Sequence, residues 1–148
     1  MSATPLPVEE PAFRDALAGL QQLPLDARLG LFEADAIFRE VNRHTVVYFL
    51  GAVQSVQMQL CHPWVATAVF EHSKIMSNPR RRAQLTYIYL WSLIYGDRDM
   101  VAKKAGALYR VHARVQGNLG TPAGNHAAGS HYQANEAHAL LWVHVTAF

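Results

Sequence analysis

The stretch Ser77-Asn78-Pro79-Arg80-Arg81-Arg82-Ala83-Gln84-Leu85-Thr86 decides the fold class, because it holds a strong helix start signal. The side-chain oxygen of an Asn or Ser accepts a hydrogen bond from a backbone N–H that has no helical partner, and Pro fits the first helical position. Apolar residues then recur at helical spacing until Gly96-Asp97 ends the pattern. This stretch therefore predicts a long helix that begins at Pro79.

Helical patterns also occupy most of the chain on both sides of this stretch. A Pro-rich, flexible lead covers residues 1–10, and Gly117–Ser130 is rich in Gly, Asn, Ala and Pro, which predicts a loop. Strand signals are poor throughout. The other helices are expected at about residues 11–23, 29–41, 46–61, 63–70, 99–116 and 135–148. The predicted fold class is all-α, with a single helical domain over residues 11–148.

The composition limits what the chain can be. Its 148 residues are 51% hydrophobic, which suits one globular domain with a sizeable core. The net charge is only +2, so no nucleic-acid partner is expected. Acidic residues gather in the first part of the chain and basic residues in the middle, from Lys74 to Arg114. Two interpretations stay open: a solvated helical surface, or basic residues that face the anionic edge of a cofactor.

The single cysteine and the N-terminal residues bear on the compartment. Cys61 has no second cysteine to pair with, so no internal disulfide forms. Met1–Pro5 has no basic region followed by an apolar core, which is the pattern of a secretory signal. We therefore expect a cytoplasmic protein.

One segment raises the question of a membrane span. No Asp, Glu, Lys or Arg lies between Arg43 and Glu71, and that distance is long enough to cross a bilayer by count. Several Gln side chains and His62-Pro63 interrupt the segment, however. We therefore expect two buried helices that meet at Pro63, and no transmembrane span.

His112 is the first candidate for chemistry. It lies in the basic and apolar stretch Tyr109–Gly117, where Leu108, Val111 and Val115 are its neighbours on a helix. Neutral imidazole is a good axial ligand for haem iron, and apolar neighbours are needed to hold a porphyrin. The alternative is an ordinary core or surface histidine.

Arg82 and Thr86 form the second candidate. They are four residues apart and so share one helical face. A guanidinium and a hydroxyl both donate hydrogen bonds, to iron-bound dioxygen or to an ordered water. The alternative is a surface arginine and a threonine that the helix tolerates.

Other kinds of site have weaker support. The Gly-rich loop lacks the ending of a phosphate-binding P-loop, and no His-Glu-x-x-His or Gly-x-Ser-x-Gly pattern occurs. Cys61 and His62 are adjacent, and adjacent helical residues do not face each other, which argues against a cysteine protease. A non-haem metal site that uses the loop histidines His126 and His131 stays open as an alternative.

Short blocks that contain these candidates occur in a characteristic order. They are Gln59–Ala66, Glu71–Ser73, Asn78–Thr86, His112–Gly117, Tyr132–Glu136 and Leu141–His144. In this order they resemble the family of latex-clearing rubber oxygenases and MpaB-type oxygenases. The resemblance covers roughly Val41–Phe148.

The resemblance implies a globin-like helical bundle that holds a b-type haem. It places the axial, iron-binding histidine at His112 and the distal residues at Arg82 and Thr86. The rubber oxygenases have a Lys before the distal Thr that can approach the iron, and here that position is Leu85. Because Leu cannot ligate iron, the sixth position is expected to be open or to hold water, which favours dioxygen binding.

The resemblance also bears on the end of the chain. Members of the family continue well beyond the Trp-Val-His block, so the oxygenase-like domain of residues 11–148 is expected to be incomplete at its C-terminus. The apolar segment Trp142–Phe148 ends without a polar tail. A homo-oligomer or a partner chain that covers this end is therefore expected.

Taken together, these observations predict a haem-b-dependent oxygenase-like protein. It would use dioxygen on an apolar substrate, isoprenoid or lipid-like, with a pocket lined by apolar residues of Met58–Phe70. The alternative is a non-enzymatic helical module of the same family, which binds haem or a partner without turnover.

Overall fold

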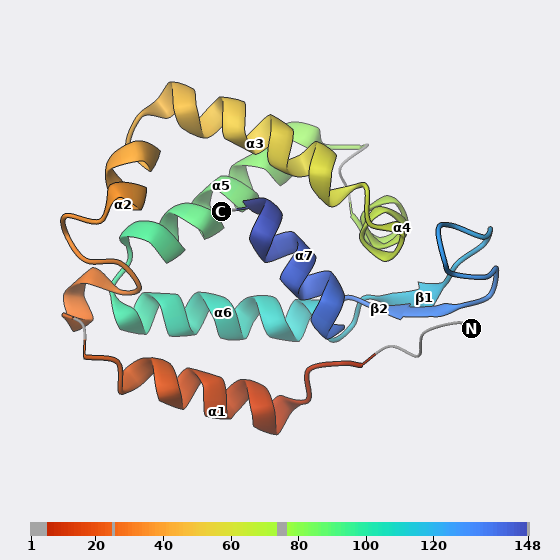
Figure 1. The fold of residues 1–148 in the computed structure, drawn as a ribbon, viewed down its shortest axis with the longest axis horizontal. Coiled ribbons are helices and arrows are strands. Elements are labelled where there is room, and N and C mark those ends of the chain that lie inside the picture. The colour runs from red at the N-terminus through yellow and green to blue at the C-terminus, as the bar shows by residue number, and fades with distance from the viewer. Residues whose placement is uncertain (1–5, 25, 74–76, 148) are drawn as a thin grey trace. The chain divides into compact units, whose positions relative to one another are not determined.

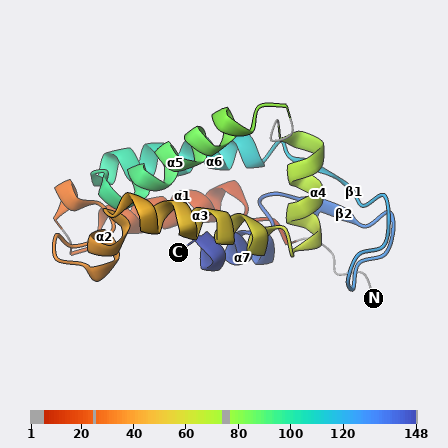
Figure 2. The same ribbon diagram turned by 90° about the horizontal axis from the view of Figure 1, so that it is seen from above.

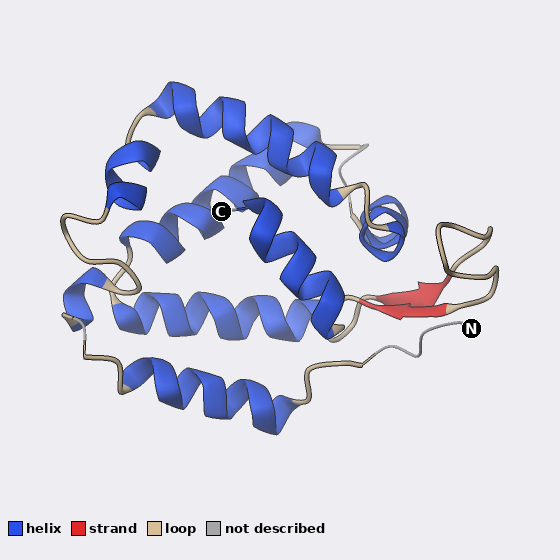
Figure 3. Ribbon diagram, viewed as in Figure 1, coloured by secondary structure: helices blue, strands red, loops and turns tan. Residues whose placement is uncertain are grey.

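The computed structural model describes residues 6–24, 26–73 and 77–147 (Figure 1). Within them, the chain is mainly helical, as predicted, with one small antiparallel sheet (Figure 3). The elements are α1 (Glu10–Gln21), a 3₁₀ turn (Ala27–Leu29), α2 (Ile37–Asn42), α3 (Thr45–Gln59), α4 (Pro63–His72), α5 (Pro79–Tyr95), α6 (Arg98–His112), β1 (Gln116–Asn118), β2 (His131–Gln133) and α7 (Ala137–Ala147). The two short strands were not predicted, because the sequence around them reads as a loop.

Helix α5 begins at Pro79, as the sequence predicts. The Asn78 side chain accepts a hydrogen bond from the Arg81 backbone N–H at 3.0 Å, and Pro79 occupies the first helical position. The helix ends before Gly96, where a Cβ would meet the carbonyl oxygen of Ser92 at 2.3 Å. Local signals therefore set both ends of this helix.

The helix predicted over residues 29–41 is wrong in its first part. Gly30 adopts a φ of +70°, which interrupts a helix, and α2 begins only at Ile37. A Cβ at position 30 would lie 2.3 Å from the carbonyl oxygen of Gly96. This close approach of two backbone segments requires glycine, and no periodic apolar pattern reveals it.

The chain divides into two compact units. The first unit comprises Met1–Val8, Gly51–Ser77 and Tyr109–Phe148, and the second comprises Glu9–Leu50 and Asn78–Leu108. Helices α3 and α6 each contribute residues to both units. Each unit is described separately below.

The core of the first unit lies between α4 and the small sheet. Trp64, Leu119 and Tyr132 are buried together, with Ala68 packed against them. Figures 1 and 2 both show α4 beside the β1–β2 pair, in which Gly117 lies opposite Tyr132. Phe70, which was expected to line an apolar pocket, is 61% exposed, whereas Trp64 is buried.

Residues 6–8 also belong to this unit. The Val8 N–H donates to the Asn135 carbonyl at 2.8 Å, and the Ala137 N–H donates to the Leu6 carbonyl at 3.0 Å. The Tyr109 hydroxyl donates to the Val8 carbonyl at 2.9 Å. This segment is thereby tied to the start of α7 and to α6.

Two arginines organise the second unit. Arg98 is buried and donates to the carbonyls of Gln21, the last residue of α1, and Leu23, at 2.8 and 3.0 Å. Arg39 donates to the Ile94 carbonyl at 3.0 Å, and its guanidinium lies 5.0 Å from the centre of the Tyr95 ring. Both side chains satisfy carbonyls at helix ends, which otherwise lack partners.

Large apolar side chains remain exposed on α3 and α7. On α3 they include Val46, Leu50 and Val53. A helix that is apolar on several sides is usually covered by other groups. Over the part of the chain that the structure describes, no helix combines the length and the apolar character that a membrane crossing needs.

Candidate functional site

His112 is the last residue of α6, in the first unit. The predicted helix continued to Gln116, but the chain leaves the helix after His112, and the Val115 N–H donates to the His112 carbonyl at 3.0 Å. The His112 side chain is half-buried, and its neighbour Val111 is 58% exposed. The imidazole thus lies, half-buried, at a helix end.

Arg82 and Thr86 lie on α5, in the second unit. Their predicted spacing on one helical face is observed, because the Thr86 hydroxyl donates to the Arg82 carbonyl at 3.0 Å. A hydroxyl has a single proton, so in this conformation it is used within the helix. The lone pairs of the Thr86 oxygen remain available to accept a hydrogen bond.

The Arg82 guanidinium is exposed at the start of α5. Among the described residues, carboxylates form ion pairs with Arg14, Arg28 and Arg43, whereas Arg82 has no such pair. An exposed guanidinium without a carboxylate partner is suited to bind an anionic group or a polar oxygen ligand.

The side chains around these residues are apolar. Leu85 is 51% exposed and Ile88 is 42% exposed, both on α5 within one turn of Thr86. Imidazole, guanidinium and apolar side chains are each the kind of group that a haem needs. His112 belongs to the first unit and Arg82 and Thr86 to the second, so they are described separately and not as one site.

A second group of polar residues, which the sequence analysis missed, lies in the first unit. The Tyr132 hydroxyl donates to a Glu71 carboxylate oxygen at 2.5 Å, and the His72 Nε2 lies 3.0 Å from the same hydroxyl. Tyr132 is fully buried. Burial raises the pKa of the Tyr132 phenol far above its usual value, and the hydrogen bond to Glu71 raises it further. The phenol therefore stays protonated and ties β2 to the end of α4.

Only one signal in the sequence hints at this group. Glu71 and His72 lie next to each other in one block, and Tyr132 begins another, but 61 residues separate Glu71 from Tyr132. Spacing along a helix or strand cannot reveal a contact of that range.

The loop histidines do not form a common site. His131 lies with its Nδ1 3.3 Å from the Asn118 side-chain oxygen, whereas the His126 ring packs against Trp64. Within residues 6–24, 26–73 and 77–147, no three His, Cys, Asp or Glu side chains are grouped so that they could hold a metal ion. The non-haem alternative thus gains no support from the geometry.

Comparison with protein families gives one match. The profile described as "ER-bound oxygenase mpaB/B'/Rubber oxygenase, catalytic domain" matches residues 39–148. This range includes α5, α6 and the β1–β2 pair, and therefore every candidate residue above. Searches of curated proteins and of solved structures gave no match.

Proposed function

Because this chain belongs to the family of the mpaB and rubber oxygenase catalytic domains, we propose that it is a haem-b-dependent oxygenase. In this proposal, the substrate is apolar, isoprenoid or lipid-like, and dioxygen is the second substrate. The observation that carries the proposal is the match of the oxygenase catalytic domain over both α5 and α6. His112 would hold the haem iron through its imidazole.

The position of His112 is compatible with this role. An iron ligand must be neutral imidazole with one ring nitrogen directed at the metal. The half-buried place at the end of α6 leaves part of the His112 side chain exposed. When bound, the haem supplies the iron at which dioxygen reacts.

Arg82 and Thr86 have different parts in the proposal. The Arg82 guanidinium would donate hydrogen bonds to dioxygen or to a water, since its five N–H groups are donors only. The Thr86 hydroxyl can act as a donor there only after rotation about χ1 breaks its bond to the Arg82 carbonyl. Threonine in a helix has two accessible χ1 rotamers, so this rotation is available.

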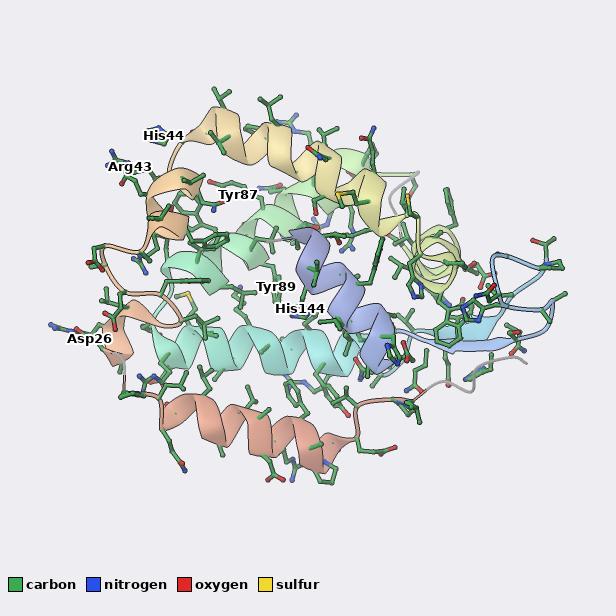
Figure 4. All side chains as sticks on the ribbon, in the orientation of Figure 1. Asp26, Arg43, His44, Tyr87, Tyr89 and His144 are labelled. Atoms are coloured by element: carbon green, nitrogen blue, oxygen red, sulfur yellow. The ribbon has the colours of Figure 1, made fainter. Side chains whose placement is uncertain are left out.

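The proposed haem ligand is tested by visible spectroscopy of the purified chain with added haemin. We expect a Soret band of a histidine-ligated haem, and we expect His112→Ala to abolish or shift it. His44→Ala is the matched control, because His44 projects outward at the start of α3 (Figure 4). A Soret band that is unchanged in His112→Ala, or absent from the unaltered chain, would contradict the proposal.

The second candidate is a haem-binding or interaction module without turnover. Two observations favour it: Leu85 cannot ligate iron, and the Thr86 hydroxyl is held within its own helix. Oxygen-electrode measurements with a carotenoid, squalene and a fatty acid separate the two candidates. Dioxygen consumption with one of these substrates supports the oxygenase, and bound haem without consumption supports the module.

A further inference from the structure

The loop that joins β1 and β2, residues 119–130, is docked on the start of α4. Ala123 and His126 exchange two backbone hydrogen bonds, of 3.0 and 3.1 Å, around a turn at Gly124 with a φ of +56°. A Cβ on Gly124 would lie 3.7 Å from the Pro63 Cγ. The turn therefore lies against the first residues of α4.

The contact that holds this loop is a tilted pair of rings. The centre of the His126 ring lies 4.6 Å from the centre of the Trp64 ring, and the His62 ring lies 6.0 Å away from the same indole. Trp64 is only 4% exposed, so both histidines lie beside a core residue. A charge gained by either imidazole would enter an apolar environment.

Three buried polar atoms meet around this indole without a hydrogen-bond partner among the described residues. They are the His62 Nδ1, the Trp64 Nε1 and the His126 Nδ1. An imidazole that takes up a proton becomes a donor at both ring nitrogens. Since neither Nδ1 has an acceptor here, protonation adds a donor that is stabilised only if the ring reaches water.

The charged and titratable groups near His62 come from the loop and from the start of α7. Burial lowers the pKa of His62, and the nearby His126 and His138 lower it further, while the Glu136 carboxylate opposes the effect. Glu136 is buried, and one of its oxygens already accepts from the Ala139 N–H at 2.7 Å. The net direction is downward, so the docked loop favours neutral His62.

We propose that His62 is the proton-sensitive part of a latch, in which the neutral His62 ring and the contact of His126 with Trp64 keep residues 119–130 docked, and protonation of His62 releases the loop. The direction of the pH dependence follows from the linkage between proton binding and docking. Undocked His62 has a pKa near its ordinary value of 6.5, and docked His62 binds the proton less well. Docking is therefore fully favoured above that pH and weakens as the pH falls below it.

Hydrogen exchange of the whole chain tests the latch at about pH 7.5 and about pH 5.5, with each rate corrected for its intrinsic pH dependence. The informative amides are those of Leu119 and Gly129, which are bonded within the loop at 2.9 and 2.7 Å. We expect their protection to fall at the lower pH, by up to about tenfold for each unit by which the His62 pKa is lowered. The amides of α1 and α2, in the second unit, should keep their protection.

Substitution of the two histidines tests whether their rings cause the pH dependence of loop protection. In the double variant His62→Gln/His126→Gln, neither position titrates, and we expect loop protection that no longer depends on pH. His44→Gln is the control, since its side chain is 59% exposed and lies 3.9 Å from Glu40; it should retain the full pH response. Circular dichroism establishes that each variant is folded.

Two outcomes overturn the latch. One is loop protection in the unaltered chain that is equal at the two pH values, a result that needs no variant. The other is a pH response that persists unchanged in the folded double variant. If the double variant does not fold, the single variants are compared with His44→Gln in the same way, and an undiminished response in both of them contradicts the proposal.

Discussion

At the scale of single residues, the pairing of Gly117 with Tyr132 makes room for the buried phenol in the core of the first unit. The two residues lie opposite each other in the β1–β2 pair, and a Cβ on Gly117 would meet the Tyr132 hydroxyl oxygen at 2.7 Å. Only glycine leaves room for the phenol to reach Glu71 and His72. The sequence pattern predicts a loop that begins at Gly117, a role that concerns backbone conformation alone.

Gly117→Ala should therefore destabilise the protein. The added methyl group forces the buried phenol aside and disturbs its hydrogen bond to Glu71, which we expect to cost about 1–3 kcal/mol of unfolding free energy. Chemical denaturation measures the change. Gly120→Ala is the matched control in the same loop, because a Cβ there meets nothing within 4 Å. Equal stability of the two variants would contradict this reading of the contact.

The raised pKa of Tyr132 gives a prediction for alkaline pH. The phenol has its ordinary pKa of 10.0 when the chain is unfolded and a higher one when it is folded. Its contribution to stability is thus complete below pH 10.0 and is lost as the pH rises above it. We expect Tyr132→Phe to reduce the fall in the denaturation midpoint above that pH. Part of the fall should remain, because burial also raises the pKa of Tyr89 and Tyr95.

At the scale of elements, α5 shows how far local signals reach. Its cap, its first-turn proline and its end at Gly96 are all found where the sequence predicts them. The helix also carries a ladder of aromatic rings, in which Trp91 lies 5.5 Å from Tyr87 and 4.2 Å from Tyr95. These rings are four residues apart, so the ladder follows from helical spacing alone.

Removal of the cap should loosen the start of α5. In Asn78→Ala, the Arg81 N–H loses its acceptor, and we expect a loss of about 1 kcal/mol of stability. Asn78→Ser keeps an oxygen acceptor at this position and should stay close to the unaltered chain. Thermal unfolding followed by circular dichroism compares the three proteins. If the alanine and serine variants unfold at the same temperature, the cap contributes no stability.

At the scale of the whole molecule, the most distinctive property is the apolar surface of α3 and α7. Val46, Leu50 and Val53 on α3, and Val145 on α7, are each more than half exposed. Exposed apolar side chains in this number are typical of surfaces that associate with other groups. The expected homo-oligomer, or partner chain over the C-terminal end, remains a prediction.

Replacing part of this surface with polar groups tests that expectation. We expect Leu50→Gln/Val53→Gln to lower self-association, because these side chains are 70% and 63% exposed and lose little packing. Light scattering at several protein concentrations measures the association, and circular dichroism checks that the helices are kept. Val101→Gln is the contrasting variant, since Val101 is buried and its replacement should unfold the chain instead. Unchanged scattering from the folded double variant would refute the prediction.

The sequence by itself determined the helical class and the positions of α1, α3, α4, α5 and α7, because caps, prolines and apolar periodicity act within a few residues. It also determined the spacing of Arg82 and Thr86 and the family of the chain. Only the tertiary structure decided the break at Gly30, the β1–β2 pair and the bonds of Tyr132 to Glu71 and His72. Each of these depends on segments far apart in the chain approaching closely, and three-residue strands are too short to show a period of their own.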